Sequence, residues 1–223
     1  MNVAINSSIT AILITFAVIG GGLKFIDEAF DEDVFDKRFA MVLTPILVVL
    51  WVWVSVVDKV SAVILFSILL GVLLTGKIDN FIFKISTIAL IVFFALRGLG
   101  PYLIPLVFLT LMGIVDEKGN DFVDNNSANK VVEFFFLHRF SMKFGIMLLC
   151  AASYFSPIYF VAFLCFDIAY DSVGIVSKSI VAKTERMSLH FLTDLPPGLL
   201  QDRIMFLKDN PLSLDGTLVT LNM

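Results

Sequence analysis

Long apolar blocks separated by short polar breaks run along most of the chain. Seven such blocks cover residues 9–25, 39–57, 60–74, 81–96, 102–115, 140–155 and 158–176. Nearly every position within a block is apolar, whereas an amphipathic helix of a soluble protein shows an apolar stripe every three or four residues. A transmembrane helix needs about 20 mainly apolar residues. The pattern therefore predicts an all-α protein, a polytopic membrane helix bundle of about seven transmembrane helices.

The composition supports a membrane environment. Hydrophobic residues make up 58% of the chain, the mean hydropathy is +0.93, and charged residues account for only 16%, against about 25% in ordinary soluble domains. The polar residues of the chain are too few to cover the core of a soluble protein, so we expect membrane lipid around the helices. Because no basic patch is interleaved with aromatic residues, we expect no nucleic-acid partner.

The last two blocks fit either one helix kinked at Pro157 or two helices joined by a tight turn. Lys and Arg gather on the cytoplasmic side of membrane proteins, so their distribution separates the two alternatives. With two helices and the N-terminus outside, 14 of the 16 basic residues lie inside and only Lys59 and Arg97 lie outside. The sequence thus favours seven helices, an outer N-terminus, an inner C-terminus and a plasma-membrane location with the charged face in the cytoplasm.

The polarity of the chain changes near residue 178. Residues 1–177 contain all seven apolar blocks and are expected to form the transmembrane bundle. Residues 178–223 are more polar, with scattered apolar side chains that can lie along a membrane surface. We expect this second part to be a cytoplasmic or interfacial tail.

Two acidic groups follow apolar blocks on the predicted inner side. Asp27 and Asp31 come after the first block with the i, i+4 spacing that places two side chains on one helix face. Asp116 and Asp121 come after the fifth block. Carboxylates of this kind bind Mg²⁺ together with phosphate oxygens and water. Spacing alone is also compatible with solvated acidic loops.

Asp167 and Asp171 lie inside the last apolar block, again at i, i+4 spacing. Counting from Ile158 at about 1.5 Å per residue, Asp167 is roughly 14 Å deep, near the middle of the membrane. A carboxylate there costs several kcal/mol unless it is paired, neutralised or in contact with water, and such residues often mark functional sites. The alternatives are a structural hydrogen bond to a neighbouring helix and a helix register that places Asp167 near the membrane interface.

A family resemblance gives the acidic groups a specific interpretation. Residues 27–31 (DEAFD), followed by 36–38 (DKR), resemble the first aspartate-rich motif of the UbiA-type intramembrane prenyltransferases. Residues 115–121 (VDEKGND) are similar to the second motif of that family, and four helices separate the two motifs, as in the family. The resemblance implies a Mg²⁺ cofactor held by Asp27, Asp31, Asp116 and Asp121. It also implies an isoprenoid diphosphate substrate contacted by Lys77 and Asp79 in the inner loop between them.

Three functions follow as hypotheses. The leading one is a Mg²⁺-dependent membrane prenyltransferase, with Asp167 and Asp171 added to Lys77 and Asp79 as substrate-binding residues. The second is a small transporter or channel that uses Asp167 and Asp171 as a cation or proton site. The third is a non-catalytic subunit of a larger membrane complex, whose inner loops bind a protein partner.

Overall fold

The computed structural model describes residues 2–76, 81–98, 100–125 and 129–193 of the 223-residue chain. All regular structure in these residues is helical, and they contain no strand, so the predicted all-α class is confirmed. In chain order the elements are α1 (Asn2–Phe30), α2 (Lys37–Val57), α3 (Lys59–Leu74), α4 (Phe81–Arg97), the short η1 (Gly100–Tyr102), α5 (Leu103–Asn125), α6 (Lys130–Leu137), α7 (Phe140–Ala151) and α8 (Pro157–Thr193).

The chain divides into two compact units, residues 1–177 and 178–223. The described part of the second unit, residues 178–193, is the C-terminal portion of α8, with exposed basic side chains at Lys178, Lys183 and Arg186. The first unit contains α1 to α7 and the first part of α8. All contacts discussed below lie within this first unit.

Among the described residues, three helices are long and apolar enough to cross a membrane, namely Ser8–Phe30, Lys37–Val57 and Ile158–Thr184. The segments Lys130–Phe136 and Phe140–Ala151, bent by 62° relative to each other, form a fourth candidate if they act as one span. Lys59–Leu74 and Lys84–Leu96 are shorter apolar helices. These helices are compatible with an integral membrane protein. The seven predicted blocks fall largely on helices, whereas seven separate crossings stay a prediction.

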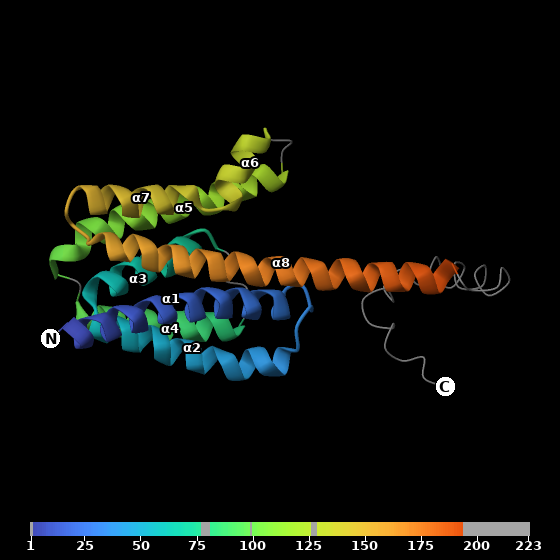
Figure 1. Cartoon of the computed structure of the whole chain (residues 1–223), viewed down its shortest axis with the longest axis horizontal. Helices are drawn as coiled ribbons and strands as arrows, with labels where there is room; N and C mark the ends of the chain where they lie inside the picture. The colour runs from blue at the N-terminus through green and yellow to red at the C-terminus, as the bar shows by residue number, and fades with distance from the viewer. Residues whose placement is uncertain (1, 77–80, 99, 126–128, 194–223) are drawn as a thin grey trace. The chain divides into compact units, whose positions relative to one another are not determined.

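Helices α1 to α5 run alternately in opposite directions, α6 and α7 form a bent continuation that returns against α5, and α8 runs opposite to α7 (Figure 1). We call the end where α1 finishes at Phe30 and α2 begins at Lys37 the acidic end. Helix α5 also finishes at this end, whereas α7 begins nearer the middle of the bundle (Figure 1). The α2–α3 junction at Asp58 and the turn between α7 and α8 lie at the opposite end.

Helix α3 forms the core of the first unit. It is apolar on every side, and residues 62–65 have no exposed surface at all. This pattern is typical of a helix that is surrounded by others. It packs on α2 and most extensively on α5, where Gly71 faces Gly113. A Cβ on Gly71 would lie 3.4 Å from the Gly113 backbone, so the two helices approach to within ordinary van der Waals contact.

A run of three glycines lets α1 approach two neighbours closely. A Cβ on Gly20 would overlap the backbone carbonyl of Phe166 in α8. A Cβ on Gly22 would lie 2.6 Å from a methyl group of Leu47 in α2. Close packing through small residues is a main source of helix association in membrane proteins. The glycines thus fix α1 between α2 and α8.

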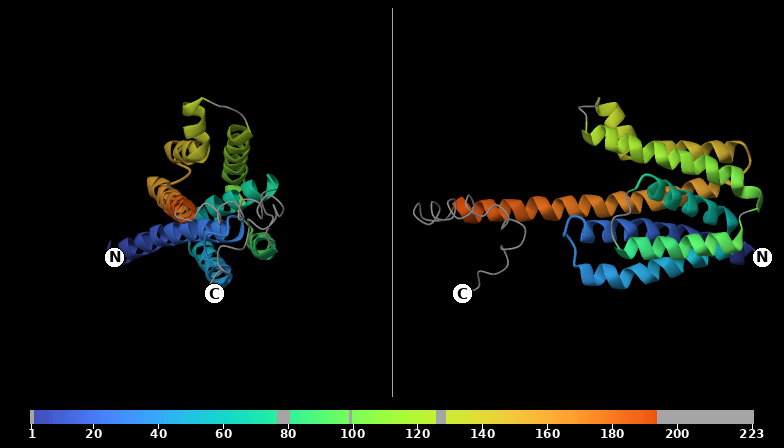
Figure 2. Two further views of the ribbon diagram at one scale, coloured as in Figure 1. Left: turned by 90° about the vertical axis from the view of Figure 1, so that its right-hand side faces the viewer. Right: turned by 180° about the vertical axis from the view of Figure 1, so that it is seen from behind.

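The region around Pro157 contains two helices, and the alternative of one kinked helix is wrong. Helix α7 ends at Ala151, and Ser153 takes a left-handed backbone conformation with φ of 61°. The chain then reverses, and α7 and α8 run side by side in opposite directions (Figures 1 and 2). Pro157 is the first residue of α8, a position where its missing N–H costs no helical hydrogen bond. The predicted block 140–155 therefore extends four residues beyond its helix.

Candidate functional site

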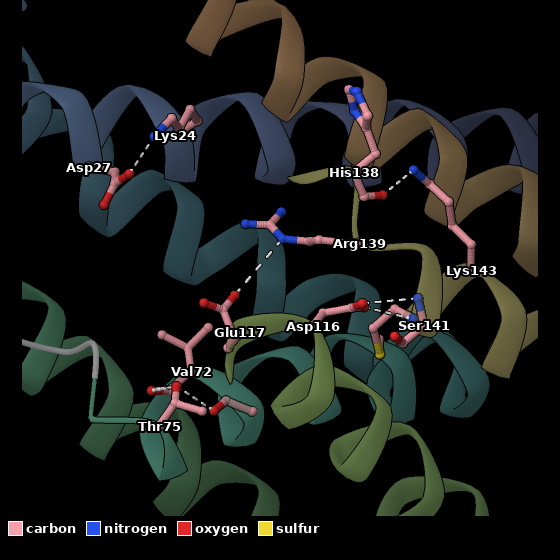
Figure 3. Close-up of polar contacts among 12 residues, drawn as sticks. Lys24, Asp27, Val72, Thr75, Asp116, Glu117, His138, Arg139, Ser141 and Lys143 are labelled. Carbon is pink, nitrogen blue, oxygen red and sulfur yellow. Dashed lines mark hydrogen bonds and ion pairs between the residues drawn. The ribbon is translucent and has the colours of Figure 1, made fainter. Parts of the chain in front are cut away.

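A buried ion pair joins α7 to α8. Lys143 Nζ lies 2.5 Å from Asp167 Oδ2, and only 4% of the Asp167 side chain and 16% of the Lys143 side chain are exposed. Lys143 Nζ also donates a hydrogen bond to the backbone carbonyl of His138 (Figure 3). The second carboxylate oxygen of Asp167, Oδ1, is buried and accepts no hydrogen bond from the described residues. Asp167 is thus paired through one oxygen and left with a free acceptor on the other.

A second pair lies one helical turn further along α8. His138 Nδ1 and Asp171 Oδ2 are 3.0 Å apart, and about a third of each side chain is exposed (34% and 32%). The ring of Phe134 contacts the His138 ring edge-on, with 4.6 Å between centroids. The two pairs therefore differ in environment, since Asp167 is sealed inside the bundle and Asp171 is partly open.

Arg139 connects these pairs to α5. It stands between α6 and α7 in the left-handed backbone conformation, with φ of 49°. Its guanidinium lies 3.9 Å from the ring centroid of Tyr170, and its Nε lies 3.9 Å from a carboxylate oxygen of Glu117 (Figure 3). Stacking on an aromatic face and pairing with a carboxylate both suit the planar guanidinium. Arg139 thereby joins α5 to the first half of α8.

Lys24 extends the same set of contacts to α1. Its Nζ lies 2.8 Å from both Asp27 Oδ2 and Glu28 Oε1, and 5.4 Å from the Tyr170 ring centroid. Glu28 in turn accepts a 2.6 Å hydrogen bond from the hydroxyl of Ser177, 149 residues later in the chain. We define the ion-pair network as these residues together with Asp116 of α5: Lys24, Asp27, Glu28, Asp116, Glu117, His138, Arg139, Lys143, Asp167, Tyr170, Asp171 and Ser177.

Asp116 has a structural contact at the start of α7. Its carboxylate accepts hydrogen bonds from the backbone N–H groups of Ser141 (2.9 Å) and Met142 (2.8 Å), and the residue is almost fully buried. The first N–H groups of a helix have no partner within it, and an acidic side chain satisfies them well. Burial raises the pKa of the Asp116 carboxyl, although these two N–H groups and nearby Arg139 act to lower it.

The structure places the predicted metal ligands as follows. Asp27 is paired with Lys24, and Asp116 binds the first turn of α7. Asp31 is exposed just after α1, and its backbone N–H bonds to the Asp27 carbonyl. Asp121 is half-buried on α5. In the described residues no three His, Cys, Asp or Glu side chains lie close enough together to hold a metal ion.

The remaining predicted substrate-binding residues fall into two groups. Lys77 and Asp79 lie outside the described residues. Asp167 and Asp171 are brought together on one face of α8, and each has a basic or imidazole partner. Asp167 thus makes the contact with a neighbouring helix that was one of the predicted alternatives. The other oxygen of the same carboxyl group has no hydrogen-bond partner among the described residues.

Sequence reasoning did not identify the partners His138, Arg139 and Lys143. In the sequence, Arg139 and Lys143 are two of the 14 basic residues on the predicted inner side. The sequence does contain a signal for the Lys143–Asp167 and His138–Asp171 pairs. In each pair the two residues are equally far along the sequence from residues 154–155. Two antiparallel helices joined by a turn at that point bring both pairs together.

Comparison with known proteins gives no relative. No protein-family model, no curated protein and no solved structure matches this chain.

Proposed function

We propose that the chain is an integral membrane protein that transports a proton or a small cation, and that Asp167 binds the transported ion. The supporting observation is the asymmetric state of this buried carboxyl group. One oxygen accepts from Lys143, and the other accepts nothing from the described residues. Ionisable side chains in membrane helices face the bundle interior and mark ion pathways and proton relays.

The charge of the ion-pair network also supports a positive ion. The network contains six carboxylates but only three permanently charged basic side chains, Lys24, Arg139 and Lys143. An excess of negative charge in a low-dielectric environment is costly. Binding a proton or a cation reduces that excess, so the network has a physical reason to take up positive charge.

The proposal includes the full predicted topology. Seven crossings with an outer N-terminus would place the acidic end in the cytoplasm, in the plasma membrane. The alternating helix directions and the distribution of Lys and Arg support this arrangement (Figure 1). Helix α7, with 12 residues, is only about 18 Å long, so its crossing requires the bent continuation through α6.

Ion flux into vesicles tests the transport proposal. The purified protein is reconstituted into lipid vesicles, and the uptake of H⁺, Na⁺ and K⁺ under an imposed gradient is compared with protein-free vesicles. Asp167→Asn keeps the size of the side chain and is expected to abolish the flux. Glu32→Gln removes one charge from an exposed position near the acidic end and should leave the flux unchanged. Wild-type flux that persists in Asp167→Asn rejects the site, and no wild-type flux of any of these ions rejects transport.

A Mg²⁺-dependent prenyltransferase is the second candidate. The ends of α1 and α5 carry the two aspartate-rich segments, and both lie at the acidic end (Figure 1), which supports this candidate. When bound, Mg²⁺ would neutralise a diphosphate and favour its departure. Asp27 and Asp116 already have partners, however, so ligation would require Lys24 and the first turn of α7 to release them. For this reason it ranks second.

Thermal stability separates the prenyltransferase from the transporter. A ligand that binds only the folded state at a hundred times its dissociation constant stabilises it by about 2.7 kcal/mol. If the chain is a prenyltransferase, Mg²⁺ and geranylgeranyl diphosphate together will raise the melting temperature, and Mg²⁺ alone will not. Asp31→Ala should remove the shift. A cooperative melt that is unaffected by the two ligands together rejects this second candidate.

A further inference from the structure

We infer that the ion bound at Asp167 is a proton, and that the His138–Asp171 pair exchanges this proton with water at the acidic end. The inference rests on the proposed transport function and names its substrate. It is carried by the ligands available around Asp167, by the charges next to it and by the difference in exposure between the two pairs.

The surroundings of Asp167 do not suit a metal cation. Sodium sites in transporters use backbone carbonyls freed where a membrane helix is interrupted. Helix α8 is continuous from Pro157 to Thr193, so the carbonyls around Asp167 remain in helical hydrogen bonds. Hard cations such as Mg²⁺ and Ca²⁺ take six or more oxygen ligands, whereas the observed site offers one free carboxylate oxygen. One free oxygen is enough for a proton.

The neighbouring charges lead to the same conclusion. The Lys143 ammonium touches one oxygen of the Asp167 carboxylate, and Arg139 stacks on Tyr170, three residues further along the same helix. A metal ion at Asp167 would be repelled by both cations at short range. A proton, in contrast, forms an O–H bond to the carboxylate and leaves no separate charge beside them. Lys143 stays in place when Asp167 is neutral, because it also binds the His138 carbonyl.

The two pairs form a path from the interior to the exterior of the bundle. Asp167 is 4% exposed, whereas His138 and Asp171 are about one third exposed. Asp171 follows Asp167 by one turn, a rise of about 6 Å along α8, which one water molecule can bridge. An imidazole has one nitrogen that can accept a proton and one that can donate a proton, so it can pass protons on. The His138–Asp171 pair thus has the position and the chemistry of an exchange group.

Charged and titratable groups from four parts of the first unit face this path. They are Lys24 from α1, Asp116 and Glu117 from α5, Arg139 and Lys143 from the start of α7, and Asp167 and Tyr170 from α8. The transfer itself is balanced. The O–H bond of the Asp167 carboxyl breaks, its proton passes through the bridging water to the His138–Asp171 pair, and the pair then releases a proton to bulk water. Asp167 is left as a carboxylate paired with Lys143.

Parallel flux measurements test the inference. Vesicles containing the full-length protein are assayed for H⁺ uptake with an internal pH-sensitive dye and for Na⁺ uptake with the radioactive isotope. We expect H⁺ uptake without Na⁺ uptake. His138→Gln and Asp171→Asn should each lower the H⁺ flux about tenfold or more, and Asp171→Glu, which keeps a titratable group, should recover it. Glu133→Gln, an exposed carboxyl on α6, is the matched control and should behave as wild type.

The outcomes distinguish this inference from the function on which it rests. Na⁺ uptake that depends on Asp167 overturns the proton assignment and keeps transport. Proton flux that is unaffected by His138→Gln and Asp171→Asn overturns the exchange pair. If these variants do not fold, infrared spectroscopy of the wild type decides instead. A carboxylic-acid band that grows as the pH falls and is missing in Asp167→Asn supports the proton at Asp167, and its absence overturns it. No flux of any ion rejects the transport function itself.

Discussion

Replacing Lys143 by Met tests how strongly the buried ion pair contributes to stability. Methionine keeps the length and the apolar stem of the side chain but removes the charge, and Asp167 keeps only 4% exposure. Removing one partner of a buried pair typically costs about 3–5 kcal/mol. The cost of neutralising the Asp167 carboxylate falls in the same range. An aspartic acid with an ordinary pKa near 3.9 must take up a proton at pH 7 to become neutral, which costs about 4 kcal/mol. We therefore expect the unfolding free energy to fall by about 4 kcal/mol.

The pH dependence and a second substitution identify the cause of that loss. Protonating Asp167 costs less free energy as the pH falls below 7. The unfolding free energy of Lys143→Met should therefore rise by about 1.4 kcal/mol relative to wild type for each pH unit down to pH 5. In Lys143→Met with Asp167→Leu no charge remains, and most of the loss should disappear at every pH. The assay is reversible unfolding in mixed detergent micelles. A loss below about 1 kcal/mol that does not change with pH would refute the buried pair.

Three further predictions concern the contacts that hold the first unit together. Gly20→Val should lower the unfolding midpoint in detergent, because the larger side chain overpacks against Phe166 at a cost of about 1–3 kcal/mol. Gly21→Ala is the control and should change the midpoint little, because the nearest atoms to its Cβ lie at 3.6 Å or more. Ser55→Ala should leave thermal stability unchanged or raise it, because the buried hydroxyl has no partner among the described residues; a clear loss would indicate a bound water. Asp116→Ala should cost about 1–3 kcal/mol and speed amide hydrogen exchange in the first turn of α7, and unchanged exchange would contradict the capping role.

The helices could be predicted from the sequence because lipid imposes a simple rule. Every backbone N–H and C=O within the bilayer must be bonded inside the protein, so a long apolar block is almost always a helix. The residues at which the helices end are harder to predict from the sequence. The block 140–155 is apolar to its end, yet α7 stops at Ala151 because Ser153 adopts a left-handed turn conformation. Nothing in the polarity of this block marks that reversal.

The candidate site could be predicted only in part, because its contacts join distant residues. Asp167 and Asp171 stand out as carboxyls in an apolar helix, and this property is visible in the sequence. The contact between Asp116 and the start of α7 is not visible, since 25 residues separate Asp116 from Ser141. Local spacing suggests a shared ligand for an acidic group but cannot show that a carboxylate is already bound elsewhere in the fold.

The pairing of α7 with α8 has a consequence for the biosynthesis of the protein. An Asp at the centre of a membrane helix raises the free energy of insertion by about 2.5–3.5 kcal/mol, and α8 carries two carboxyl groups in its apolar part. Helix α7 is short and holds Lys143, which is synthesised 24 residues before Asp167. Helix α7 alone is too short to be a favourable membrane segment, and the two carboxyl groups make α8 a less favourable one. Both would therefore leave the translocation channel together as a hairpin with matched charges.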